Sequence, residues 1–144
     1  MKKILVVDDE IDMLLLLNMI IKEKTPYEVI TTNNPYEALE MFNKEKFDIV
    51  IADLKMPGMD GLQLWEEIRK INPEVPFILI TAYGTLEAAQ EAMEKEVFDF
   101  ILKPFKKEQI IFTIKKAIKW LELQKENKIL KEKLKFSEDT KEHL

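Results

Sequence analysis

Short apolar segments alternate with longer segments of helical pattern along this chain, and this alternation restricts the fold more than any other feature. We expect strands at Lys3–Val7, Tyr27–Thr31, Ile49–Ala52, Phe77–Thr81 and Phe98–Leu102. We expect helices at Asp12–Lys24, at Pro35–Lys44, from just after Gly61 to Ile71, at Leu86–Glu94 and from Lys107 into the C-terminal region.

Strands that alternate with helices predict a parallel sheet with right-handed crossovers. All the expected strands except the second are nearly continuous in apolar residues, as parallel strands covered on both faces are. Tyr27–Thr31 is more polar and suits an outer strand. Five such units predict an α/β fold with an open, doubly wound, five-stranded parallel sheet. The functional site of such a sheet lies outside the C-terminal ends of its strands.

The composition excludes several classes of function. The 144 residues suffice for one domain with a hydrophobic core, and no apolar run is long enough to span a bilayer. The chain has no cysteine and a single histidine, His143, so thiolate metal sites and histidine-based catalysis are not expected. The net charge of −5 gives no general attraction to nucleic acid or anionic membranes. The N-terminus lacks a secretion pattern, so we expect a cytoplasmic protein without direct nucleic-acid or membrane contact.

Polar side chains occur where the expected strands end. Asp8 and Asp9 follow the first strand, Asp53 follows the third, Thr81 ends the fourth and Lys103 follows the fifth. Each has an ordinary explanation on its own: a helix cap for the first two, a turn for Asp53, a common strand-end residue, and a solvated lysine. Because the C-terminal ends of parallel strands meet at one edge of the sheet, we expect all five to form one cluster.

A cluster of three carboxylates requires cations. Each pair of carboxylates repels by roughly 4 kcal/mol at about 4 Å and an effective dielectric constant near 20. An oxygen-preferring divalent ion such as Mg²⁺ suits such a site, and together with Lys103 it would balance the charges of Asp8, Asp9 and Asp53. A carboxylate in this setting can act as a nucleophile toward phosphorus, and Asp53 is the best candidate because of its central strand.

Four segments at these strand ends resemble the receiver domain of two-component response regulators. They are ILVVDDE (Ile4–Glu10), IADLKMPGMDGL (Ile51–Leu62), ILITAYG (Ile78–Gly84) and FDFILKPF (Phe98–Phe105). Their order and spacing fit the family from about Lys2 to Leu121, which predicts a receiver domain over residues 1–121. The resemblance implies the family's flavodoxin-like (βα)5 fold.

The resemblance also implies roles for single residues. Asp53 corresponds to the aspartate that a sensor histidine kinase phosphorylates. Asp9 and Asp53 correspond to the carboxylates that bind Mg²⁺, with Asp8 assisting and the backbone carbonyl of Lys55 as the remaining protein ligand. Lys55 and Tyr83 occupy positions that tune the rate of dephosphorylation in this family.

The remaining implied roles concern the phosphoryl group and the switch. Thr81 and Lys103 correspond to the pair that contacts the phosphoryl group, and the Lys103–Pro104 bond is expected to be cis. Thr81 and Phe100 occupy the switch positions, where the family often has tyrosine in place of Phe100. Such a domain is regulatory and not an enzyme, apart from its own phosphorylation and dephosphorylation. Its change of shape is expected to control dimerisation and an output, here transcription.

The last helix carries two apolar stripes. The first has the spacing of a face that packs on a sheet and contains Ile110, Ile111, Ile114, Ala117, Ile118 and Leu121. The second lies roughly 150° around the helix, at 100° per residue, so the same core cannot cover it. It consists of Trp120, Leu123, Asn127, Leu130 and Leu134, at the spacing of coiled-coil a and d positions.

We interpret residues 122–144 as a helical extension that forms a homodimeric coiled coil and leads to an effector domain outside this chain. The alternative is a charged, solvent-exposed or fraying helix. Receivers with this kind of extension resemble those of transcriptional activators that work with sigma factor 54. Residues Ser137–Leu144 are expected to be a polar tail or a truncation point.

Two other functions are compatible with parts of the pattern. A phosphatase of the haloacid dehalogenase type also uses a strand-end aspartate and Mg²⁺. It requires Asp-x-Asp after its first strand, whereas Asp8-Asp9 is followed here by Glu10 and Ile11. A phosphorylation-independent interaction module would not need the five site residues that this chain retains. Turnover of an external phosphate ester would favour the phosphatase, and absence of an acyl phosphate after acetyl phosphate treatment would favour the module.

Overall fold

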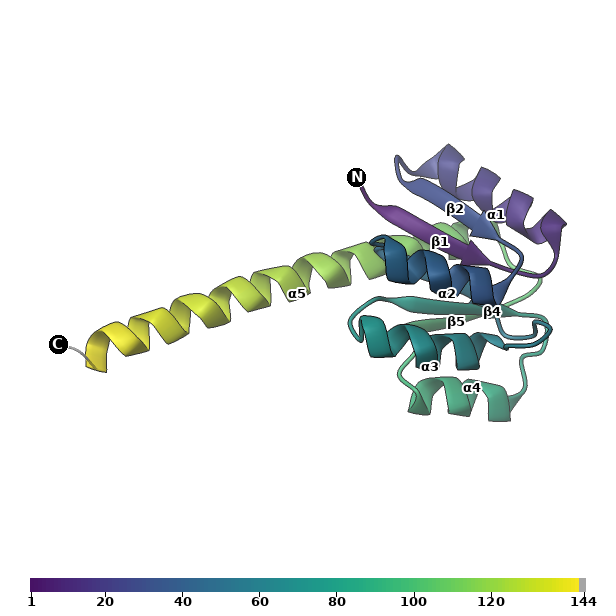
Figure 1. The fold of residues 1–144 in the computed structure, drawn as a ribbon. Helices are drawn as coiled ribbons and strands as arrows, with labels where there is room; N and C mark the ends of the chain where they lie inside the picture. Colours follow the sequence, from purple (N-terminus) through teal and green to yellow (C-terminus); the bar gives the residue numbers. More distant parts are fainter. Residues whose placement is uncertain (143–144) are drawn as a thin grey trace.

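The structure, a computed structural model, describes the backbone of residues 1–142 and the side chains of residues 1–137. Its elements, shown in Figure 1, are β1 (Lys3–Val7), α1 (Ile11–Lys24), β2 (Glu28–Thr32), α2 (Pro35–Lys44), β3 (Ile49–Asp53), α3 (Gly61–Ile71), β4 (Phe77–Thr81), α4 (Leu86–Glu94), β5 (Asp99–Leu102) and α5 (Lys107–Glu142). Every strand and helix expected from the sequence is therefore present. Several ends differ by one residue, and β2 as a whole lies one residue later than predicted.

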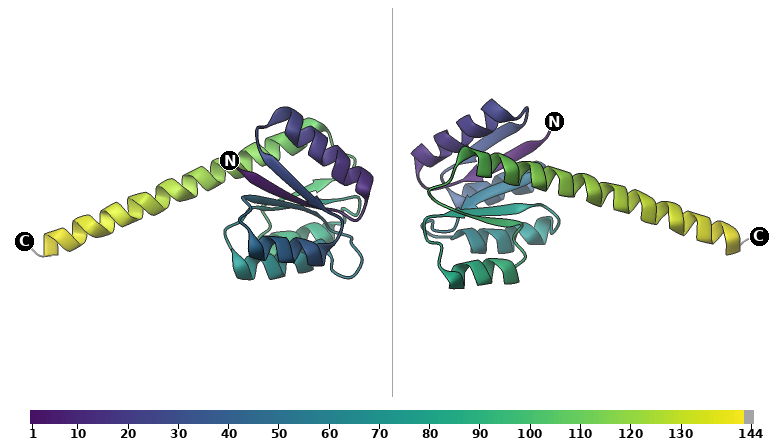
Figure 2. Two further views of the ribbon diagram at one scale, coloured as in Figure 1. Left: turned by 45° about the horizontal axis from the view of Figure 1, so that its top comes forward. Right: turned by 180° about the vertical axis from the view of Figure 1, so that it is seen from behind.

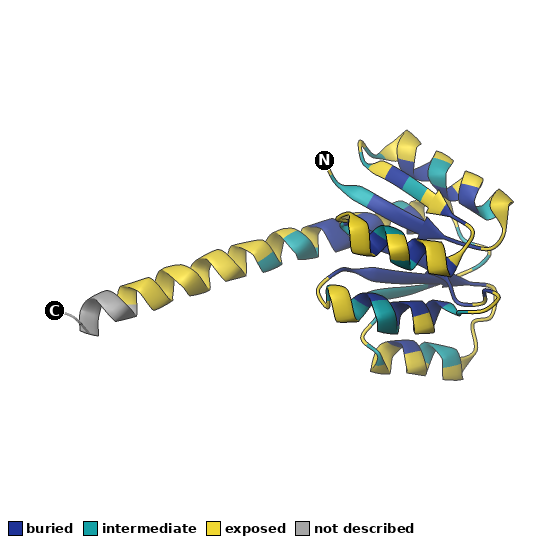
Figure 3. Cartoon of the chain, in the orientation of Figure 1, coloured by how far each residue is buried: buried dark blue, intermediate teal, exposed yellow. Residues whose placement is uncertain are grey.

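The five strands form one parallel sheet in the order β2-β1-β3-β4-β5. One hydrophobic cluster joins the sheet to α1 and α5, and a second joins it to α2, α3 and α4. The inner strands β1, β3 and β4 are consequently buried between two helical layers, as the dark blue strands of Figure 3 show, whereas the edge strands β2 and β5 are only partly buried. This arrangement confirms the predicted doubly wound α/β sheet, and it confirms β2 as an edge strand.

Local sequence signals fix where the helices begin. Asn34 caps α2 as predicted, because its side-chain oxygen accepts the N–H of Tyr36 at 2.9 Å and Pro35 follows it. Asp60 and Gln63 form a capping box at α3. The N-cap of α1 is Glu10, which makes no side-chain capping bond. The alternative in which the aspartates after β1 serve as caps of α1 is therefore wrong.

Helix α5 packs on the domain with its first half and then projects from it (Figures 1 and 2). Its first apolar stripe lies in the core: Ile110, Ile114, Ala117 and Ile118 are buried. In the second stripe, Trp120 is half-buried, with its ring edge-on to Phe98 at 6.1 Å, and the other members are exposed. Further along the helix, Lys128 forms an ion pair with Glu74 of the domain at 2.8 Å.

The C-terminal segment is helical as far as Glu142, so the backbone of the predicted polar tail is helical over residues 137–142. Residues 143 and 144, including the single histidine, lie outside the described part of the chain. Within that part, no helix combines the length and apolar character needed to cross a membrane.

Glycine at position 61 is required by a close approach. A Cβ atom there would collide with the backbone oxygen of Asp53 and the side chain of Leu79. The Gly61→Ala variant should therefore lose about 2 kcal/mol of unfolding free energy in urea titrations, because buried backbone cannot move aside. The matched control is Gly84→Ala, where the atoms nearest to the added Cβ belong to the Leu102 side chain, which is 51% exposed and can move aside. Its stability should stay within about 1 kcal/mol of wild type; equal losses in the two variants would contradict this account.

Candidate functional site

The site lies at the edge of the sheet where the strands end. Asp8 follows β1, Asp53 ends β3, Thr81 ends β4 and Lys103 follows β5. The strands pair in register at this edge, with Val7 beside Ala52 and Thr81 beside Leu102. Four adjacent strands thus bring together residues that are far apart in the sequence, at the edge where parallel α/β sheets bind ligands.

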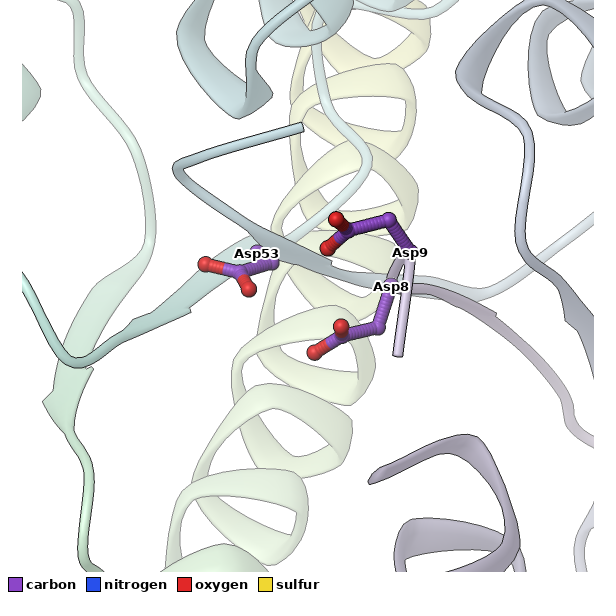
Figure 4. Close-up of side chains that lie close together, drawn as sticks. All are labelled: Asp8, Asp9 and Asp53. Atoms are coloured by element: carbon purple, nitrogen blue, oxygen red, sulfur yellow. The ribbon is translucent and has the colours of Figure 1, made fainter. Parts of the chain in front are cut away.

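Three carboxylates form the centre of the site. Carboxylate oxygens of Asp8, Asp9 and Asp53 all lie within 4.8 Å of one another. Figure 4 shows the side chains of Asp8 and Asp9 extending toward the side on which Asp53 lies. Asp8 and Asp53 are 1% and 6% exposed, whereas Asp9 is exposed. Two of the three negative charges are therefore buried, and the third lies at the entrance.

Lys103 is the cation that holds this cluster. Its Nζ donates to Oδ2 of Asp53 at 3.0 Å and to Oδ2 of Asp8 at 3.1 Å. Burial lowers the pKa of the Lys103 ammonium, but the two carboxylates outweigh burial, so its pKa is raised and it stays charged. The Lys103–Pro104 peptide bond is cis, as predicted.

One lysine does not balance the site. Burial raises the pKa of the Asp8 carboxyl, and the charge of Asp53 raises it further, although the Glu10 N–H and Lys103 oppose this. The remaining excess of negative charge and the all-oxygen donor set fit a hard divalent cation such as Mg²⁺. The residues present can therefore hold a metal ion.

The loop after β3 supplies a backbone donor to the Asp53 carboxylate. The N–H of Lys55 donates to Oδ1 of Asp53 at 3.2 Å, so both carboxylate oxygens of Asp53 have a partner. Gly58 has a φ of 85°, in the left-handed region, and the ring of Tyr36 lies directly against it. The Lys55 ammonium lies 5.4 Å from the centre of the Tyr83 ring, which joins this loop to the loop after β4.

Thr81 and Phe100, the predicted switch residues, lie on neighbouring strands. Thr81 is fully buried, and its hydroxyl oxygen accepts the N–H of Tyr83 at 3.0 Å. Phe100 is half-buried and packs against the cluster beneath α2, α3 and α4. Phe100 has no hydroxyl group, so packing alone determines its position.

The parallel sheet and its carboxylate–lysine edge define a receiver-type α/β domain. Residues 4–115 match the model of the response regulator receiver domain, and the chain belongs to this family. It is 36% identical over 117 residues to the sporulation initiation phosphotransferase F of Bacillus subtilis, covering 81% of this chain and 94% of that protein.

Longer regulators show the same similarity. The chain is 39% identical over 115 residues to the transcriptional regulatory protein GlrR of Escherichia coli, covering 80% of this chain and 26% of that protein. The crystal structure of NtrX from Brucella abortus superimposes with a TM-score of 0.83 at 34% identity, covering 90% of this chain and 30% of that one. The chain thus spans about a quarter to a third of the length of these regulators.

The sequence identified the members of this cluster but missed a contact between α2 and the loop after β3. Asp8, Asp9, Asp53 and Lys103 are brought together as expected. Tyr36 against Gly58 was missed, because an exposed tyrosine at the start of a helix carries no signal of a tertiary contact.

Removing the Lys103 charge should destabilise the folded chain, because the carboxylates of the cluster repel one another. The Lys103→Met variant keeps the side-chain length but leaves two buried carboxylates without their ammonium partner. In metal-free buffer it should lose about 3 kcal/mol of unfolding free energy, measured by urea titration. Lys55→Met is the matched control, because the Lys55 ammonium is exposed and lies over the Tyr83 ring. A Lys103→Met protein as stable as this control would contradict the electrostatic role.

Proposed function

We propose that this chain is the phospho-acceptor domain of a two-component system and that Asp53 accepts the phosphoryl group. The supporting observation is the arrangement around Asp53: a lysine at 3.0 Å, a backbone N–H at 3.2 Å and two further carboxylates within 4.8 Å. Asp53 ends the central strand β3, and 6% of its surface is exposed to solvent. The receiver occupies residues 1–121 in this proposal, and residues 122–144 extend it.

The metal site is assigned to the same carboxylates. Asp9, Asp53 and the backbone carbonyl of Lys55 would hold Mg²⁺, and Asp8 would assist through water. When bound, the ion supplies positive charge that neutralises the carboxylates and the phosphoryl oxygens. The exposed position of Asp9 leaves the ion accessible from solvent, as an incoming phosphoryl group requires.

The transfer step needs little more than positioning. A carboxylate oxygen of Asp53 attacks the phosphorus of phosphohistidine; the O–P bond forms as the P–N bond breaks, and the imidazole leaves with the electron pair. Lys103 stabilises charge on the phosphoryl oxygens, and the Thr81 hydroxyl donates a hydrogen bond to one of them. Attack by water on the acyl phosphate then releases phosphate and restores Asp53. The chain therefore acts only on itself.

The switch uses the hydroxyl of Thr81. This hydroxyl accepts the Tyr83 N–H in the unphosphorylated chain and would move toward the phosphoryl group after transfer. Space vacated by Thr81 becomes available to the half-buried ring of Phe100 on the adjacent strand. The face formed by α4, β5 and α5 changes as a result, which is a bias on a two-state element.

A sensor histidine kinase is the proposed phosphodonor, and α1 is its proposed docking surface. Ile11, Leu15 and Met19 lie one above another along α1 and are 60%, 62% and 59% exposed. The helix begins directly after the aspartates of the site, so a kinase helix on this apolar face would bring its phosphohistidine to Asp53.

The extension is proposed to form a parallel coiled-coil dimer. Leu123, Leu130 and Leu134 are 46%, 56% and 64% exposed on the projecting part of α5. A helix in water gains most of its stability from packing of its apolar face, so this part of α5 needs a partner. With Asn127 at an a position, Glu126 falls at g and Lys131 at e, an attractive pair between parallel chains. We further propose a cytoplasmic regulator whose effector domain, of the sigma-54 activator type, controls transcription.

Phosphorylation at Asp53 can be measured as intact mass. After incubation with acetyl phosphate and Mg²⁺, the wild-type chain should gain the mass of one phosphoryl group, and Asp53→Asn should gain none. Asp9→Asn should slow the gain at least about 10-fold, because it removes a carboxylate that is proposed to bind the ion directly. Asp60→Asn is the control, since this aspartate caps α3 outside the cluster. Phosphorylation that persists in Asp53→Asn would refute the assignment, and turnover of an external phosphate ester would point to a phosphatase.

Dimerisation can be measured by sedimentation. Leu130→Lys places a charge at a d position and should weaken the dimer at least about 10-fold in Kd, through the loss of buried apolar area. The control Glu132→Lys adds the same side chain at the outward f position and should leave the Kd unchanged. A wild-type chain that sediments as a monomer at all concentrations tested would contradict the coiled coil.

A further inference from the structure

Helix α4 is attached to the domain mainly by small side chains. Its one buried residue is Ala92, and Ala88 and Ala89 are half-buried. Its large apolar residues, Leu86 and Met93, are 74% and 77% exposed. Alanines bury little area and do not interdigitate deeply, so packing alone holds this helix weakly.

The C-terminal end of α4, in contrast, has a polar attachment. The backbone carbonyl of Lys95, the C-cap, accepts the indole N–H of Trp65 at 2.6 Å and the Arg69 guanidinium at 3.0 Å. Both donors come from α3, the neighbouring helix. Trp65 is 2% exposed, and its ring packs on Phe77 of β4 at 5.2 Å, so the donor itself is fixed in the core.

The turn after α4 reinforces this attachment. The N–H of Glu96 donates to the carbonyl of Met93 at 3.0 Å, and the N–H of Val97 donates to that of Ala92 at 3.1 Å. These bonds form a Schellman motif, in which Glu96 has a φ of 62° in the left-handed region. The carbonyls of Ala92 and Met93 are therefore satisfied by the turn, and the Lys95 carbonyl is held by side chains of another element.

The N-terminal end of α4 is joined instead to the phosphoryl-acceptor site. Thr85 caps the helix with its own hydroxyl, which accepts the N–H of Ala88 at 3.0 Å. Only residues 82–84 separate this cap from Thr81, and those residues are exposed. A displacement of Thr81 thus reaches the N-terminal end of α4 first.

We infer that Trp65 and Arg69 are positioning residues that make the Lys95 carbonyl a fixed pivot for α4. Phosphorylation at Asp53 then swings the N-terminal end of the helix while its C-terminal end stays in place. The inference deepens the proposed function and rests on it. It assigns a direction to the response: the exposed side chains near Leu86 move, and those near Met93 do not.

Distances between spin labels can test this pivot, because the chain contains no cysteine to interfere. One label is placed at Glu40→Cys on α2 as the reference, and the second at Glu87→Cys or Glu94→Cys on α4. The phosphoryl mimic is beryllofluoride with Mg²⁺, and its binding is followed separately by fluorine NMR. Glu87 lies about 12 Å from the pivot along the helix and Glu94 about 1.5 Å, so the distance change should be several times larger for Glu87.

Variants of the two donors give the decisive comparison. With Trp65→Phe and Arg69→Met combined, the change at Glu94 should rise toward that at Glu87, because both bonds to the Lys95 carbonyl are absent. If the double variant folds poorly, the single Trp65→Phe variant replaces it, because it keeps an apolar ring in the core. This single variant should show a distance change at Glu94 between those of the wild type and the double variant. Lys70→Met on the same helix is the control and should behave as wild type, since the ion pair of Lys70 is with Glu67 on α3 itself.

The outcomes separate the two proposals. Equal changes at Glu87 and Glu94 in the wild type, or a Glu94 position that ignores loss of the donors, would overturn the pivot while leaving Asp53 as the acceptor. Fluorine NMR that detects no bound beryllofluoride, or equal binding by Asp53→Asn, would refute the acceptor assignment and the pivot with it.

Discussion

The mutual repulsion of buried carboxylates is the constraint on which this domain depends. Asp8 and Asp53 are almost fully buried beside Asp9, and in water-poor surroundings such charges are costly unless cations share them. Lys103 bonds to both buried aspartates and keeps them in place. The same excess of negative charge that needs this lysine also fits a hard divalent cation.

The fold supplies the geometry that this chemistry needs. A parallel sheet covered on both faces brings four strand ends to one edge, and the helices leave that edge open. The charged cluster therefore rests on a buried core, whereas the proposed response to phosphorylation involves less well packed elements. Helix α4, packed by alanines and held by two side-chain donors at one end, is one of these elements.

The sequence predicted the elements and the cluster because both depend on local patterns. Apolar runs mark the strands, and the residues after them meet at one edge by the rule for parallel sheets. The contacts of Trp65 and Arg69 with the Lys95 carbonyl were not predictable, since they join helices 26 to 30 residues apart and use a backbone acceptor without a residue signature. The shift of β2 by one residue has a similar cause: edge strands carry a weak apolar pattern.

The central claim is that distant carboxylates share one divalent ion, and anomalous diffraction from a crystal grown with Mn²⁺ tests it most directly. The ion should appear as a single peak within about 2.2 Å of carboxylate oxygens of Asp9 and Asp53, close to the backbone carbonyl of Lys55. Absence of a peak between these two aspartates at saturating Mn²⁺, or a peak only elsewhere on the chain, would contradict the account.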